Sequence, residues 1–123
     1  MNANEFRQEL VLFMPGYRWT VHRSTSPRVM RATGVKVSGF NRLSTLEVER
    51  RENYAGSGFP CYTVRSAGFG RKAPFLGENG DITLLRALRG LQEHYQKTAA
   101  TYRAHAHALE TGRSSSPEAS SNG

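Results

Sequence analysis

The sequence predicts an α+β fold with an antiparallel sheet of about four strands, a short N-terminal helix and a long C-terminal helix. Two periodicities carry this prediction. Residues 17–23 alternate between apolar and polar side chains, as a half-buried strand does, whereas residues 84–109 repeat apolar side chains every three or four positions, as a helix does. The spacers between the predicted strands are short, which favours an antiparallel meander over parallel crossovers.

The opening residues predict the short helix. Asn2 and Glu5 stand three residues apart, which resembles a capping box in which each side chain bonds the other residue's backbone N–H. Phe6, Leu10 and Phe13 then fall on one helical face. The proline and glycine that follow disfavour further helix. We expect this helix to close one edge of the sheet.

The middle of the chain predicts the strands. Gly34 interrupts the second of them and is typical of a bulge or bend. The glycine-rich residues 68–80 are expected to form a long irregular connection. The expected strands are 17–23, 28–37, 43–51 and 61–67. The expected core is Tyr17, Trp19, Val21, Leu46, Val48, Tyr62, Val64, Leu84, Leu88 and Leu91.

The last helix is the longest predicted element. Asp81 is expected to cap its start and Gly112 to end it. Gly90, with Ala87 one turn before it, favours a close approach by the sheet or the first helix. About 30 residues would span about 45 Å, more than the roughly 30 Å width of such a domain. We therefore expect the second half to project, with an alanine- and tyrosine-rich surface suited either to a homodimer or to the docking of a partner.

The remaining residues complete the expected domain organisation. A single domain would cover residues 1–112, and the serine-rich residues 113–123 would be a disordered tail. The chain has 123 residues, which is the usual length of one domain.

Positive charge is concentrated in one part of the chain. The net charge is +7, and the segment 18–51 holds eight basic residues against two acidic ones, which is +6 of that total. A concentrated positive field attracts polyanions, chiefly nucleic acid. Four of these cations flank the first predicted turn without acidic neighbours in sequence, and two more stand in a glycine-rich stretch. The expected phosphate contacts are Arg23, Arg28, Arg31, Lys36, Arg71 and Lys72.

The glycine-rich stretch also carries a resemblance of layout. Gly68, Gly70, Arg71 and Lys72 precede the last helix. A helix, several strands and a basic glycine-rich loop before a final helix resembles the order in double-stranded-RNA-binding domains. In that family the basic residues open the helix, whereas Pro74 and further glycines intervene here. The resemblance is an analogy of layout, not of family membership, and it leaves both DNA and RNA open as the polyanion.

Other classes of function lack their sequence patterns. No acidic pair, nucleophile elbow or metal-ligand spacing is present, so we expect no enzyme, no cofactor and no metal site. Cys61 is the one cysteine, which excludes an internal disulfide and favours a reducing cytoplasm. The first residues lack an export signal, and no apolar run is long enough to cross a membrane.

Three functional hypotheses remain open. The first is a non-enzymatic nucleic-acid-binding accessory protein of little base specificity. The second is an interaction module that docks on an acidic protein or a ribonucleoprotein, as small phage-encoded inhibitors and adaptors do. The third is a dimer whose long helices pair. Four aromatic residues are expected in the core rather than in a base-stacking platform: Tyr17, Trp19, Phe40 and Tyr62.

Overall fold

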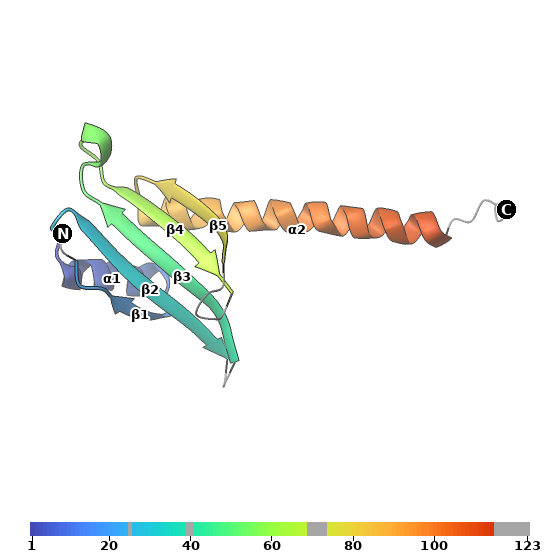
Figure 1. Cartoon of the computed structure of the whole chain (residues 1–123), viewed down its shortest axis with the longest axis horizontal. Helices are drawn as coiled ribbons and strands as arrows, with labels where there is room; N and C mark the ends of the chain where they lie inside the picture. Colours follow the sequence, from blue (N-terminus) through green and yellow to red (C-terminus); the bar gives the residue numbers. More distant parts are fainter. Residues whose placement is uncertain (25, 39–40, 69–73, 115–123) are drawn as a thin grey trace. The chain divides into compact units, whose positions relative to one another are not determined.

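A computed structural model describes residues 1–24, 26–38, 41–68 and 74–114. It confirms the α+β class, with a five-stranded antiparallel sheet in the order β1-β2-β3-β4-β5 (Figure 1). The described chain forms two compact units, one that ends at Leu91 and one that begins at Gln92. The elements are α1 (Ala3–Phe13), β1 (Arg18–Val21), β2 (Val29–Ser38), β3 (Asn41–Arg51), a 3₁₀ turn (Tyr54–Gly56), β4 (Cys61–Ala67), β5 (Phe75–Asp81) and α2 (Leu84–Ser114).

Helix α1 begins with the expected capping box. The Asn2 side chain accepts from the Glu5 backbone N–H at 2.9 Å, and the Glu5 carboxylate accepts from the Asn2 backbone N–H at 2.7 Å. Phe6 and Leu10 are completely buried. Phe13 ends the helix and is 37% exposed, so the apolar face of α1 packs through its first two turns.

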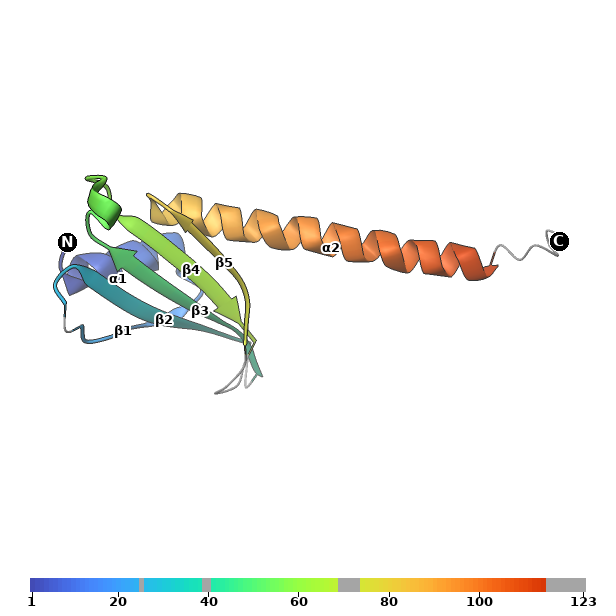
Figure 2. The ribbon, with the colours of Figure 1, turned by 45° about the horizontal axis from the view of Figure 1, so that its top comes forward.

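Within the first unit, α1 and the start of α2 pack on the same face of the sheet, here called the inner face (Figure 2). The register places Trp19, Ala32, Val48 and Val64 on this face, and all four are buried. Helix α1 contributes its two buried residues, and the start of α2 contributes its own buried residues. These are Leu84, Ala87 and Leu91. Of the expected core residues, Tyr17, Val21 and Leu88 are only half-buried.

The predicted number of four strands was wrong, because a fifth strand, β5, forms within the residues expected to be a long irregular connection. Phe75–Asp81 pairs with β4 over most of its length, in a register that sets Glu78 beside Arg65. Its sequence contains two glycines, an asparagine and two acids, residue types that strands usually avoid. Pairing with β4 and contact with α2 therefore outweigh its low strand propensity, and local sequence reasoning could not detect it.

Gly34 has a different role from the expected bulge. The register shift in β2 lies between Lys36 and Val37, and Gly34 itself pairs regularly with Trp19 and Leu46. A Cβ atom on Gly34 would lie 2.8 Å from the Trp19 ring. The glycine therefore leaves the space in which the indole packs on the inner face. Trp19 also donates from Nε1 to the Met14 carbonyl oxygen at 3.0 Å, which ties β1 to the end of α1.

The start and end of α2 differ from expectation. Thr83, not Asp81, caps the helix: its hydroxyl accepts from the Arg86 N–H at 3.2 Å. Asp81 ends β5, accepts from the Ile82 N–H at 2.6 Å and lies 3.4 Å from the Arg86 guanidinium. The helix continues through Gly112 to Ser114.

Gly90 confirms the expected close approach of the sheet to α2. The Asn79 side chain of β5 occupies the space that a Cβ on Gly90 would need. Its amide donates to the Ala87 carbonyl oxygen at 3.0 Å. The missing side chain at Gly90 therefore allows β5 and α2 to share a direct polar contact.

Replacement of Gly34 tests the Trp19 packing. Because the added methyl group would overlap the indole, Gly34→Ala should lower the free energy of unfolding by about 1–3 kcal/mol in urea denaturation. Gly80→Ala is the matched control in another strand, since its Cβ would meet the nearest atom at an ordinary 3.6 Å. Equal stability of the two variants would contradict the proposed packing.

Candidate functional site

The outer face of the sheet, opposite the helices of the first unit, carries cross-strand ion pairs. Arg65 in β4 bonds Glu78 at 2.9 Å and approaches Glu47 at 3.8 Å. It also lies 5.2 Å from the centre of the Phe75 ring. These contacts place Arg65 and Glu47 on the same face of the sheet. Arg65 is therefore balanced by acids on both neighbouring strands.

A second set of contacts centres on Glu49. This carboxylate accepts from Arg31 Nε at 2.9 Å and from Arg51 Nε at 2.7 Å, so one negative charge serves two guanidinium groups. Partial burial favours the neutral form of Glu49, but the hydrogen bonds and charges of the two arginines outweigh it and lower its pKa below the ordinary value. Glu49 therefore remains ionised and holds two arginines at the surface.

The β1–β2 turn carries two more arginines at the same end of the sheet as Arg31 and Arg51. Arg23 and Arg28 are exposed, and within the described ranges neither has a carboxylate partner. Serine hydroxyls order the turn: Ser24 donates to the Ser26 carbonyl oxygen at 2.8 Å, and Ser26 accepts from the Arg28 N–H at 3.3 Å. The turn is thus held by its own side chains, which leaves both guanidinium groups in water.

A hollow of about 440 Å³ lies beside this turn. Its wall combines two of the arginines with small hydroxyl side chains, a histidine and one acid. The lining residues are His22, Arg23, Ser24, Ser26, Val29, Arg31 and Glu47. His22 shares a 2.7 Å hydrogen bond with the Thr33 hydroxyl. We define Arg23, Arg28, Arg31 and Arg51 as the turn cluster.

The turn cluster includes three of the six expected contact residues, Arg23, Arg28 and Arg31. Lys36 lies elsewhere, because it is five residues beyond Arg31 in β2, which is about 17 Å along the strand. Like Gly34, it also has the strand parity of the inner face. A Cβ on Gly16 would lie 3.5 Å from the Lys36 ammonium, which places that group near the end of α1. Arg71 and Lys72 lie outside the described residues.

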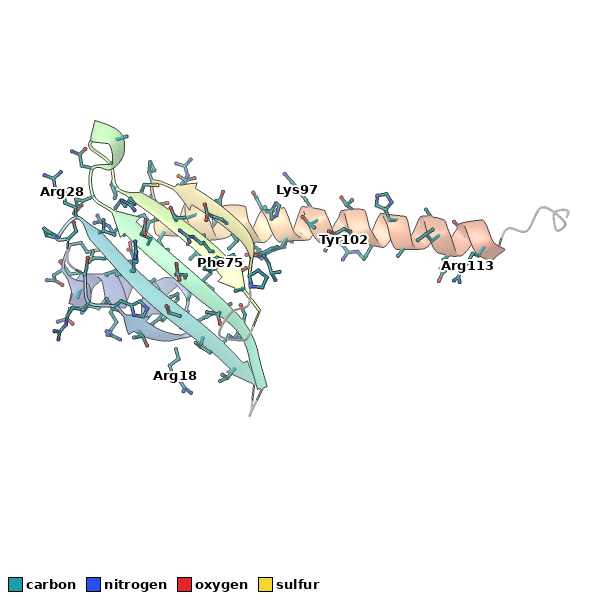
Figure 3. The ribbon with its side chains drawn as sticks, viewed as in Figure 1. Arg18, Arg28, Phe75, Lys97, Tyr102 and Arg113 are labelled. Atoms are coloured by element: carbon teal, nitrogen blue, oxygen red, sulfur yellow. The ribbon has the colours of Figure 1, made fainter. Side chains whose placement is uncertain are left out.

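The basic residues of the segment 18–51 lie toward both ends of the sheet. Figure 3 shows Arg28 at the β1–β2 turn end and Arg18 toward the other end. This separation follows from the register, since Arg18 pairs with Val35 whereas Val29, next to Arg28, pairs with Arg51. The basic segment is therefore divided rather than gathered into one surface.

Arg51 is the member of the cluster that sequence reasoning missed. It is distant in sequence from the first turn, but the pairing of Val29 with Arg51 brings it there. The sequence did indicate the face on which Arg51 lies, because Arg51 has the same strand parity as Glu49 and Glu47. Identifying its neighbours still required the register between β2 and β3.

Arg50, unlike Arg51, does not join the turn cluster, because its side chain points to the inner face. The residue is 8% exposed, and its Nε donates to the Tyr62 hydroxyl at 2.9 Å. Tyr62 in turn donates to Glu9 of α1 at 2.8 Å, and Glu52 accepts from Arg50 at 3.0 Å. Burial and the bond to Glu9 raise the pKa of Tyr62 against the opposing effect of Arg50. Arg50 therefore stabilises the contact between α1 and the sheet, and its charge does not contribute to the basic surface.

Other kinds of site have no support in the described part of the chain. No three His, Cys, Asp or Glu side chains there lie close enough together to hold a metal ion. None of its helices is both long and apolar enough to cross a bilayer. No protein-family model, curated protein or solved structure matches the chain, so its function must be inferred from its own residues.

Glu49→Gln tests the electrostatic role of the shared carboxylate. At pH 7 we expect the variant to be less stable by about 0.5–1 kcal/mol, since exposed pairs contribute little and this one is only partly buried. The folded-state pKa of Glu49 is lowered from 4.5, so its stabilisation is present above about pH 4.5 and is lost as the pH falls through the lower folded value.

Urea denaturation of both proteins between about pH 7 and pH 3 measures this dependence. The difference in unfolding free energy should shrink toward acid. Glu110→Gln in α2, which has no ion pair within the described ranges, should show no such change. A difference that stayed constant with pH would show that Glu49 acts through packing instead.

Proposed function

We propose that this chain is a small non-enzymatic nucleic-acid-binding protein that holds phosphate groups with its turn cluster. One observation carries the proposal: Arg23 and Arg31 line one hollow, Arg31 and Arg51 share Glu49, and Arg28 precedes Val29, the strand partner of Arg51. Among the described residues, Glu49 is the one carboxylate ion-paired with any of these four arginines. Glu47 also lines the hollow, so four positive charges stand against two negative ones, and this local excess attracts a polyanion.

The chemistry of the side chains suits phosphate. A guanidinium group has five N–H donors in a rigid fork that matches two phosphate oxygens. Arg23 and Arg28 offer this fork to solvent, while Glu49 holds Arg31 and Arg51 without neutralising both. The hydroxyls of Ser24 and Ser26 add short polar groups beside the hollow.

The same surface favours binding of low sequence specificity. Phosphate contacts position a nucleic acid but do not read its bases. Among the described residues, those that line the hollow include no Phe, Tyr or Trp on which a base could stack. Tyr17, Trp19 and Tyr62 are buried or half-buried, which agrees with a structural role for these rings.

Salt-dependent binding tests the turn cluster. Each phosphate contact adds about 0.9 to the negative slope of log affinity against log salt on duplex DNA. Arg23→Ala/Arg28→Ala should therefore make the slope shallower by about 1.8 and weaken binding. Fluorescence anisotropy with labelled duplex DNA, single-stranded DNA and RNA, from about 50 mM salt upward, gives the measurement.

The matched control is Arg89→Ala/Arg103→Ala, which removes the same charge from exposed positions of α2. It should leave the slope nearly unchanged. Equal effects of the two double variants would show a dependence on net charge alone. Absence of binding to all three probes at about 50 mM salt would overturn the proposal. Capture of a protein partner that survives nuclease treatment would then favour docking on an acidic protein.

A further inference from the structure

The second unit contains a regular apolar stripe on α2. Tyr95, Tyr102 and Leu109 are spaced by seven residues within the helix. A seven-residue spacing returns to almost the same helical angle, so these side chains share one face. Tyr102, labelled in Figure 3, is 70% exposed, and Leu109 is 72% exposed. The stripe therefore presents two large apolar groups to solvent.

The positions that flank this stripe are small and uncharged. Thr98, Ala99 and Ala106 lie within one turn of its tyrosines on the same face, together with His105. Charged residues between Tyr95 and Leu109 lie off this face, and Arg113 joins it only beyond the last leucine. Small flanking residues would let a second helix approach closely, and no charge between the tyrosines and the leucine would have to be desolvated.

We propose that this stripe pairs with the same stripe of a second copy of the chain. The spacing is self-complementary. With two helices antiparallel and Tyr102 opposite Tyr102, Tyr95 of each copy would face Leu109 of the other. Antiparallel pairing also sets the positive end of each helix dipole beside the negative end of its partner. Repeats of seven then specify a left-handed pair of helices.

Charge permits this association despite the basic character of the chain. The segment Gln92–Ser114 holds three basic and two acidic residues, so it carries only +1 of the net +7. Repulsion between two copies is therefore weak along the seam itself. The polar residues of the segment, such as Lys97 and Arg103, remain in water on either side.

The available area supports a reversible dimer. Gln92–Ser114 would give a contact about 34 Å long. A tyrosine buries roughly 150–250 Å². Tyr95 is already half-buried, so the exposed Tyr102, Leu109 and Ala106 supply most of the contact, and the two copies would bury somewhat under about 1,000 Å² in total. That area is close to the minimum for a specific interface. Pairing would also stabilise a helical segment whose residues 100–114 are all exposed.

Replacing either of two alanines by glutamate separates this proposal from general effects on the helix. Ala106 lies on the stripe, one turn after Tyr102, whereas Ala104 lies on nearly the opposite side of the helix. Ala106→Glu and Ala104→Glu make the same chemical change at exposed helical positions. The first should weaken dimerisation by at least about tenfold, since it places a carboxylate in the seam, and the second should leave it unchanged.

Sedimentation equilibrium of the full chain, nuclease-treated and at high salt, measures the association from micromolar to several hundred micromolar protein. High salt separates it from nucleic-acid binding, so failure here leaves the proposed function intact. The proposal predicts a dimer for the wild type and Ala104→Glu. A wild-type monomer throughout, or equal dissociation of both variants, would overturn it. Binding of that monomer to anionic lipid vesicles would assign the stripe to a membrane surface instead.

Discussion

Alternation along the strands is the constraint on which the charge distribution of this protein depends. Successive side chains point to opposite faces of the sheet, and within the first unit both helices pack on one face only. Arg50 and Arg51 show the consequence, because they are neighbours in sequence but their side chains lie on opposite faces of the sheet. Arg50 is buried on the inner face, where it bonds Tyr62, whereas Arg51 bonds Glu49 on the outer face. A count of basic residues therefore overestimates the positive charge available at the surface.

Burial of Arg50 is stabilising only because its partners are present. A buried cation is costly unless it is paired and hydrogen-bonded, and Arg50 has both Tyr62 and Glu52. Tyr62 extends the chain of bonds to Glu9, so the same network holds α1 against the sheet. Together with the Trp19 bond at the end of α1, it keeps the inner face covered. The outer face remains available for the arginines that we assign to phosphate binding.

Local patterns predicted the elements whose signals are local. The capping box of α1 and the alternation around Trp19 depend on residues a few positions apart, and both are present in the structure. Strand β5 and the Thr83 cap were missed. The strand forms from residues of low propensity because β4 and α2 supply its contacts. Asp81 has a suitable cap residue type, but its place at the end of β5 leaves Thr83 to begin the helix.

The amino-acid pattern by itself determined the class of fold, the two helices and the excess of arginine near the first turn. Tertiary structure alone decided which arginines become neighbours, because strand register joins residues that are distant along the chain. Register brought Arg51 to Arg31 through Glu49, and strand length carried Lys36 away from both. Periodicity can state which side chains share a face, but only the pairing of strands places them next to one another.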